Sequence, residues 1–203
     1  GLATVAGAMP LGAGHGPPAA MARAAGAGIV CGLINGGMVT ALRIPPFIVT
    51  LGMLGIARGL AKLLAGNQRI APPPESLGRL EGFVDKTPEL AWLQVAPAAW
   101  CLLGTAIFAG FVLRRTPFGV QVVAIGSSEP TARLCGVPVA RTKILVYALC
   151  GLGAGLAGAV TLGRLGVGDP TTAVGLELQI IAAVVIGGAS LSGGEGGIRL
   201  LQG

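Results

Sequence analysis

Four long apolar runs constrain the fold of this chain more than any other feature of its sequence. They cover Ala19–Leu42, Phe47–Leu64, Ala91–Leu113 and Ile144–Leu162, and charged residues are rare inside them. A helix needs about 20 consecutive apolar residues to cross the hydrocarbon core of a bilayer, where it satisfies its own backbone hydrogen bonds. The sequence therefore predicts an all-α membrane protein, a polytopic transmembrane helical bundle with about four full spans.

Composition excludes several other classes of protein. Of the 203 residues, 53% are hydrophobic and only 11% are charged, against about a quarter charged in a typical soluble domain. The 36 glycines lie inside apolar runs, where they permit close helix packing and do not indicate disorder. The net charge of +6 comes from basic residues strung between apolar runs with few aromatic residues, so a nucleic-acid-binding surface is not predicted.

Both ends of the chain carry apolar segments that are too short to be ordinary spans. Gly1–Leu11 is predicted to be the last part of a helix, and Leu176–Ala189 is followed by the glycine-rich string SLSGGEGG. The second segment is either a half-span that breaks inside the bundle or the beginning of a full helix. We therefore expect partial spans at both ends, as in a piece of a longer membrane protein.

The segments between the spans differ in charge. Residues 114–143 carry five basic side chains and one acidic side chain, a balance of +4, whereas residues 66–90 carry three basic and four acidic, a balance of −1. Basic loops favour the cytoplasmic side of a membrane. The sequence thus predicts one transmembrane domain over residues 1–203, with a cytoplasmic loop at 114–143 and an extracytoplasmic loop at 66–90.

Small residues recur every fourth position in three of the predicted spans, which places them on one face of each helix. Such faces let two helices approach closely in lipid. The predicted packing residues are Gly28, Gly32, Gly36, Gly55, Gly59, Gly151 and Gly155. Asn35 and Thr50 are candidates for lining a translocation path, and Asn35 could equally form a hydrogen bond between helices.

A short helix is predicted inside the basic loop, over Glu129–Cys135. Ser127 or Ser128 can cap it, Pro130 fits its first turn, and Gly136 can end it in a left-handed conformation. A helix of this length is unstable alone in water, so it must dock onto another surface unless the segment is only a solvated loop.

Residues for catalysis, nucleotide binding or metal binding are not recognisable. The sequence has no GxxxxGK[ST] phosphate loop and no HExxH motif, and His15 is its only histidine. Cys31, Cys101, Cys135 and Cys150 have no metal-ligand spacing, and we expect no disulfide between them. The chain is therefore predicted to be no enzyme, with no cofactor of its own.

Four strings of the sequence resemble the permease subunit of ribose-type ABC importers for monosaccharides. They are NGGMVTALRIPPFIVTLGMLGIARGLAKLLAGNQ, AIGSSEPTARLCGVPVARTK, LVYALCGLGAGLAGAVTLGRLG and AAVVIGGASLSGGEG, and together they cover most of residues 35–196. Pro130, Cys135 and the final IRLLQG depart from the family pattern. The resemblance identifies the chain as a fragment of a larger permease.

This resemblance implies a membrane-spanning subunit that carries a monosaccharide such as ribose across the bacterial inner membrane. Its implied partners are cytoplasmic ATP-binding subunits, a periplasmic sugar-binding protein and a second permease copy, identical or not. The implied coupling segment is 124–137, and the residues that carry the match are Ala124, Ile125, Gly126, Glu129, Ala132, Arg133, Gly136 and Val137. Docking of this segment onto its partner is expected to rest on an apolar and small face, with Arg133 as the charged anchor, and the residues of that face are Ala132, Leu134 and Cys135. A permease for branched-chain amino acids or nucleosides, or a membrane scaffold that transports nothing, are the alternatives.

Overall fold

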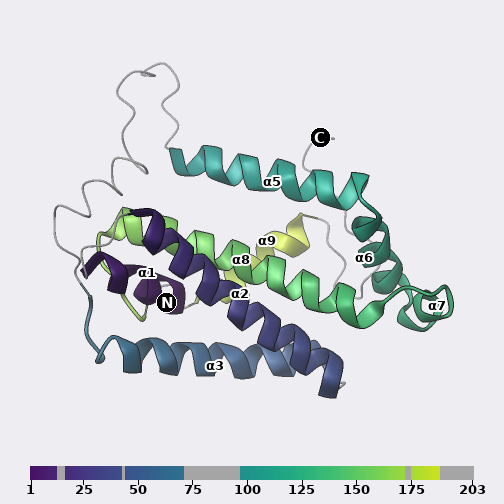
Figure 1. Ribbon diagram of the computed structural model, residues 1–203, viewed down its shortest axis with the longest axis horizontal. Coiled ribbons are helices and arrows are strands. Elements are labelled where there is room, and N and C mark those ends of the chain that lie inside the picture. The colour runs from purple at the N-terminus through teal and green to yellow at the C-terminus, as the bar shows by residue number, and fades with distance from the viewer. Residues whose placement is uncertain (13–16, 43, 71–96, 172–174, 188–203) are drawn as a thin grey trace. The chain divides into compact units, whose positions relative to one another are not determined.

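A computed structural model describes residues 1–12, 17–42, 44–70, 97–171 and 175–187 of the chain. Each named element in these ranges is a helix, which confirms the predicted all-α fold (Figure 1). The helices are α1 (Leu2–Gly12), α2 (Pro17–Leu42), α3 (Pro46–Leu64), α5 (Pro97–Arg115), α6 (Pro117–Ser127), α7 (Glu129–Leu134), α8 (Val139–Leu165) and α9 (Leu176–Ile186).

The chain forms two compact units. One comprises Gly1–Leu102 and Ile144–Thr172, and the other comprises Leu103–Lys143 and Ala173–Gly203. The first unit holds α1, α2, α3 and most of α8, and the second holds α6, α7, α9, most of α5 and the first turn of α8. Each unit is described by itself below.

Three helices in the described residues are long and apolar enough to cross a membrane. They cover Pro18–Leu42, Pro46–Leu64 and Val139–Leu165, with 25, 19 and 27 residues. The first two match the predicted spans to within one residue, but α8 begins five residues before the predicted Ile144. The helix starts directly after Pro138, whose missing N–H makes it a suitable residue just ahead of a first turn. Residues 139–143 are therefore helical, and their predicted place in the cytoplasmic loop stays a prediction.

The two remaining apolar segments lie only partly within the described residues. The predicted span Ala91–Leu113 corresponds to α5, which covers Pro97–Arg115, and residues 91–96 lie outside the described ranges. The predicted segment Leu176–Ala189 corresponds to α9, with 11 residues, and residues 188–203 also lie outside. Whether this segment is a half-span or a full span therefore stays open.

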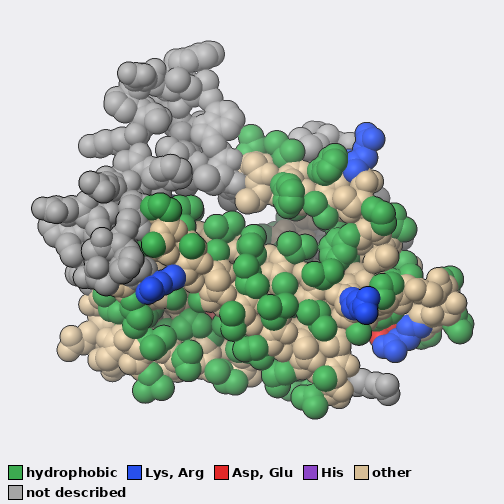
Figure 2. Space-filling view, in the orientation of Figure 1, with side chains coloured by type: hydrophobic (Ala, Val, Ile, Leu, Met, Phe, Trp, Pro, Cys, Tyr) green, Lys and Arg blue, Asp and Glu red, His purple; other side chains and the backbone are tan. Residues whose placement is uncertain are grey.

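Large apolar side chains cover the outside of the helices. Phe47, Ile56 and Leu63 of α3 are exposed, as are Ile107, Phe108 and Phe111 of α5. Figure 2 shows hydrophobic side chains spread over the visible face, with Lys and Arg at only a few places. In water, a protein with such an apolar surface would aggregate, whereas lipid tails solvate the surface. The exposed apolar side chains therefore agree with a bilayer environment.

Helices α2 and α8 pack with their backbones in contact. A Cβ atom built on Gly28 would collide with the carbonyl oxygen of Gly151, and one built on Gly32 would collide with that of Tyr147. A Cβ on Gly36 would lie 2.8 Å from the Cα of Ile144. The same interface also requires glycine on α8: a Cβ built on Gly155 would lie 2.5 Å from the carbonyl oxygen of Ala24. Side chains larger than hydrogen are therefore excluded from the centre of this interface.

Gly55 and Gly59 of α3 have a different environment. A Cβ built on either residue would meet no described atom within 4 Å. Their predicted role in helix packing thus stays a prediction, and it would require a surface other than the described residues of this chain.

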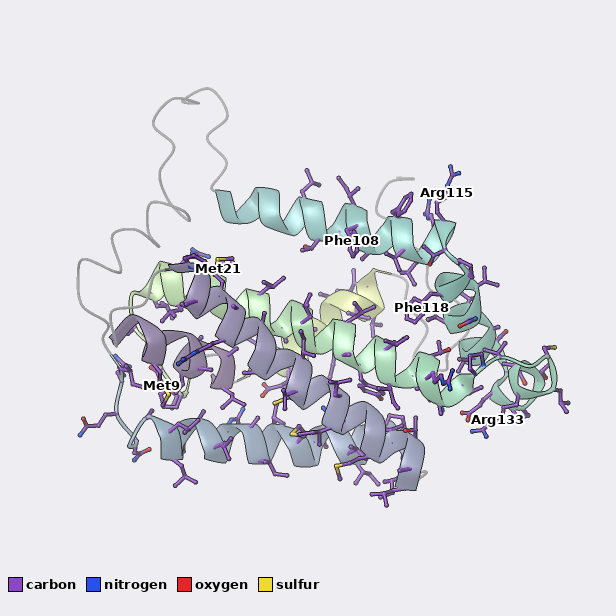
Figure 3. The ribbon with its side chains drawn as sticks, viewed as in Figure 1. Met9, Met21, Phe108, Arg115, Phe118 and Arg133 are labelled. Atoms are coloured by element: carbon purple, nitrogen blue, oxygen red, sulfur yellow. The ribbon has the colours of Figure 1, made fainter. Side chains whose placement is uncertain are left out.

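Small side chains also form the contact of α1 with α3. Val5 of α1 is fully buried against Ala61 and Ala65, and Met9 covers this cluster from the same helix (Figure 3). The hydroxyl of Thr4, also buried, donates to the carbonyl oxygen of Gly1 at 2.6 Å. Because its polar group is satisfied, Thr4 can lie in an otherwise apolar contact.

The segment that follows α3 is joined to the segment that follows α8. Ile70 and Gly168 exchange two backbone hydrogen bonds of 3.0 and 2.8 Å, and Arg69 forms an ion pair with Asp169 at 3.0 Å. The hydroxyl and backbone N–H of Thr171 both donate to the carboxylate of Asp169. These hydrogen bonds, together with Arg69, hold the pKa of Asp169 below its usual range.

Asp169 is expected to stabilise this unit in a pH-dependent way. A carboxylate with a lowered pKa stabilises the fold above its unfolded pKa, and this contribution is lost as the pH falls through the folded pKa. Asp169→Asn should therefore lower the thermal stability of the detergent-solubilised protein at pH 7, and the difference from wild type should shrink toward about pH 3. A difference that stays constant over this range would contradict the role of the carboxylate.

Candidate functional site

The candidate coupling site is built by α6, α7 and the first turn of α8, all in the second unit. Helix α6 was not predicted, although its sequence carries a start signal. Thr116 caps it by accepting a hydrogen bond from the backbone N–H of Gly119 at 3.4 Å, and Pro117 occupies its first position. The Thr-Pro pair ahead of the apolar string FGVQVVAI was the signal that could have located this helix.

A tight corner joins α5 to α6. Gly119 is buried, and a Cβ atom there would collide with the carbonyl oxygen of Leu113. Only glycine lets the first turn of α6 lie this close to the end of α5. The corner directs α6 away from the axis of α5 (Figure 1). At its other end, α6 carries two of the predicted coupling residues, the half-buried Ala124 and the exposed Gly126.

Helix α7 has the capping residues that the sequence predicts. Of the two candidate serines, Ser128 is the cap, and its hydroxyl accepts a hydrogen bond from the N–H of Thr131 at 3.4 Å. Gly136 has a φ of 80°, and the following N–H of Val137 donates to the carbonyl oxygen of Ala132 at 3.0 Å. The last helical residue is Leu134, and Cys135, predicted to be helical, is the C-cap.

One carboxylate connects α7 to α8. Glu129 accepts a hydrogen bond from Arg133 at 2.7 Å, one turn along α7, and one from Lys143 of α8 at 2.5 Å. Figure 2 shows an acidic side chain beside basic ones where α7 lies. The hydrogen bond from Lys143 is the main cause that lowers the pKa of Glu129, and Arg133 adds to it. The group is therefore ionised at neutral pH, and both bonds are charge-assisted.

A second polar contact connects α6 to the same turn of α8. The hydroxyl of Thr142 lies 3.2 Å from the side-chain oxygen of Gln121 and 3.1 Å from the carbonyl oxygen of Pro138. Thr142 is only 2% exposed. Helices α6 and α7 are thus both attached to the start of α8 by side chains from adjacent positions, Thr142 and Lys143.

The predicted coupling residues of α7 differ in exposure. Leu134 is 89% exposed, whereas Ala132 is 4% exposed. The methyl group of Ala132 is buried inside the unit, and the predicted role of this residue in docking stays a prediction. Arg133, labelled in Figure 3, projects from α7 and keeps more than half of its side chain exposed while it binds Glu129. Leu134 is the large apolar side chain that α7 exposes.

The two residues predicted to line a translocation path lie in the first unit. Thr50 of α3 uses its hydroxyl within its own helix, where it lies 3.0 Å from the carbonyl oxygen of Pro46. In the part of the chain that the structure describes, the side-chain oxygen of Asn35 is buried without a hydrogen-bond partner. This unsatisfied acceptor leaves both predicted roles of Asn35 open, the path and the bond between helices.

Comparison with known proteins gives the family. Residues 1–195 match the family described as "Branched-chain amino acid transport system / permease component". The chain is 40% identical over 169 residues to the L-arabinose ABC transporter permease protein AraH of Azospirillum brasilense, covering 83% of this chain and 48% of the relative. It is 39% identical over 165 residues to the L-arabinose transport system permease protein AraH of Escherichia coli K12, covering 81% and 48%.

A second group of relatives carries a different name. The chain is 40% identical over 169 residues to the autoinducer 2 import system permease protein LsrC of Klebsiella pneumoniae, covering 83% of this chain and 47% of the relative. The chain thus spans about half the length of the curated relatives it matches. No solved structure matches it.

These matches confirm the resemblance to sugar-type ABC permeases on which the sequence interpretation relied. Together with the long apolar helices, they identify a multi-pass protein of the inner membrane. The chain belongs to the family of permease components described for branched-chain amino acid transport systems.

Proposed function

We propose that this chain is part of the membrane-spanning permease subunit of an ATP-driven ABC importer for a monosaccharide. The observation that carries the proposal is α7, a capped six-residue helix attached by Glu129 to the start of a 27-residue span and exposing Leu134. A helix this short depends on its surroundings for stability, and its one large apolar side chain is open to a partner. Such a helix suits a contact that receives force from a cytoplasmic ATP-binding subunit.

The similarity to relatives supports a pentose as the substrate. Two of the similar proteins are named as L-arabinose permeases, and others as autoinducer 2 permeases. L-arabinose and ribose are both pentoses, so we propose a pentose and keep ribose as one candidate within that class. Branched-chain amino acids are the second candidate, because the family description names them.

Three kinds of partner follow from this proposal. Cytoplasmic ATP-binding subunits would supply the energy, a periplasmic binding protein would deliver the sugar, and a second permease copy would complete the translocation path. The described residues provide surfaces for lipid and for another helix, since Gly55 and Gly59 of α3 have open space beside them. A small-residue face of this kind is suited to helix association in a bilayer.

Uptake measurements test the proposed function directly. Deletion of the gene that encodes this chain should abolish uptake of labelled L-arabinose or ribose, and the same gene on a plasmid should restore it. Labelled leucine serves as the comparison for the amino acid alternative. Loss of leucine uptake with normal pentose uptake would replace the proposed substrate class, and no change for any substrate would favour the scaffold alternative.

Membrane orientation is a separate prediction, made from the charge balance of the loops. A membrane-impermeant maleimide should label Cys135 from the cytoplasmic side only. A cysteine in place of Gln68, which is exposed just after α3, should react from the outside only. The labelling compares intact cells with inverted vesicles, in protein whose other cysteines are replaced by alanine. Labelling of both positions from one side would contradict the predicted orientation.

A further inference from the structure

We infer that the Glu129–Lys143 ion pair is a brace that makes α7 and the first turn of α8 move as one body. This inference rests on the proposed function and assigns Glu129 a positioning role inside the permease. The sequence resemblance had grouped Glu129 with the coupling residues without saying what it contacts.

The connection between α7 and α8 needs such a brace. Four residues, Cys135–Pro138, separate the two helices, and Gly136 among them has a φ of 80°. Only glycine adopts such a conformation easily, and a glycine there also leaves the backbone free to adopt others. If the backbone were the only link, a force on α7 could bend this connection and would not reach α8.

The ion pair spans this connection. The Nζ of Lys143 lies 2.5 Å from one carboxylate oxygen of Glu129, and Arg133 holds the other oxygen at 2.7 Å. Arg133 lies on α7 itself, so its bond orients the carboxylate without linking the helices. Lys143 is on α8 and therefore provides the link. Its side chain is 27% exposed and that of Glu129 is 35% exposed, so the pair is partly shielded from water.

A second contact in the same turn strengthens the link. The buried Thr142 joins Gln121 of α6 at 3.2 Å, directly beside Lys143 in sequence. The first turn of α8 is thereby attached to both preceding helices. Because α8 continues as one helix from Val139 to Leu165, a displacement of its first turn is carried into the residues that pack against α2. The brace thus gives a force on α7 a direct route into a membrane span.

Removal of the brace should uncouple transport from ATP hydrolysis without loss of docking. In the complete importer, Glu129→Gln and Lys143→Met should each lower sugar uptake per ATP hydrolysed by about fivefold or more. Co-purification of the ATP-binding subunit should match wild type. The double variant should be no worse than either single variant, because both remove the same contact. Lys143→Arg should retain most of the coupling, since arginine keeps the charge and the donors.

Arg141→Met is the matched control. It removes one positive charge from the same turn of α8, at an exposed side chain, and should leave the ratio of uptake to hydrolysis unchanged. If Glu129→Gln and Lys143→Met also leave that ratio unchanged, the brace inference is wrong. It is equally wrong if either variant loses the ATP-binding subunit, since Glu129 would then be a docking residue.

Cross-linking tests the rigid-body motion itself. In a Glu129→Cys/Lys143→Cys variant that also carries Cys135→Ala, a short bis-maleimide joins the two introduced thiols. If the two helices move as one body, cross-linking should restore sugar uptake toward the wild-type value. If α7 instead slides along α8 during transport, cross-linking should abolish uptake, and the inference is wrong. A wild-type importer that neither transports sugar nor binds an ATP-binding subunit would refute the proposed function instead, so the two failures are distinguishable.

Discussion

Gly32→Ala is expected to lower the free energy of unfolding of this protein by at least about 2 kcal/mol. The new methyl group would collide with the carbonyl oxygen of Tyr147, and it would lie 2.9 Å from the carbonyl carbon of that residue and 3.0 Å from the Cα of Ala148. All three are backbone atoms of α8, so no side chain can rotate to make room. The two helices must separate, and contacts along the whole interface weaken.

Gly37→Ala is the matched control, five residues further along the same helix. A Cβ atom there meets no described atom within 4 Å, and alanine favours a helix over glycine by up to about 1 kcal/mol. This variant should therefore be as stable as wild type or slightly more stable. Thermal unfolding of both variants is measured in the same detergent, and the readout is the fraction of protein that remains monodisperse at each temperature. Equal midpoints would mean that the α2–α8 interface does not stabilise the protein.

Leu134→Asp is expected to separate the folding of the permease from its association with the ATP-binding subunit. The side chain is 89% exposed, so a charge there should leave the thermal stability unchanged. In the proposed complex the same side chain fills an apolar pocket of the partner, and an unpaired carboxylate in that pocket should weaken association by about 2 kcal/mol, roughly thirtyfold. Leu134 is a cleaner probe than Arg133, whose replacement would also disturb Glu129.

Leu134→Met keeps the size and apolar character of the side chain and should bind the partner like wild type. Affinity is measured by titrating the purified full-length permease with the ATP-binding subunit, and sugar-stimulated ATP hydrolysis should fall in parallel for the aspartate variant. Wild-type affinity for Leu134→Asp at normal expression would mean that α7 is only a connector. A loss of thermal stability would instead show that Leu134 is covered within the permease.

Much of the fold could be predicted because the bilayer imposes simple length and polarity rules. The bounds of α2 and α3 were predicted to within two residues, since Pro45 and Pro46 interrupt an otherwise continuous apolar stretch. The cap at Ser128 and the left-handed Gly136 could also be predicted, because both depend on local backbone chemistry. In contrast, the start of α8 was placed five residues too late, at Ile144. The charges of Arg141 and Lys143 are typical of loop residues, but here both residues are helical and precede the apolar part of α8.

The sequence by itself determined the class of protein, the approximate spans and the position of α7, because each of these depends on residues close together in the chain. Only the tertiary structure decided which glycines are packed against a neighbour. Gly32 and Gly59 occupy similar small-residue patterns, yet Gly32 meets Tyr147 while Gly59 has open space. It also decided that Ala132 lies inward and that Glu129 binds Lys143, 14 residues away. The spacing of small or charged residues limits which contacts can form. Which of them do form depends on which helices the folded chain brings side by side.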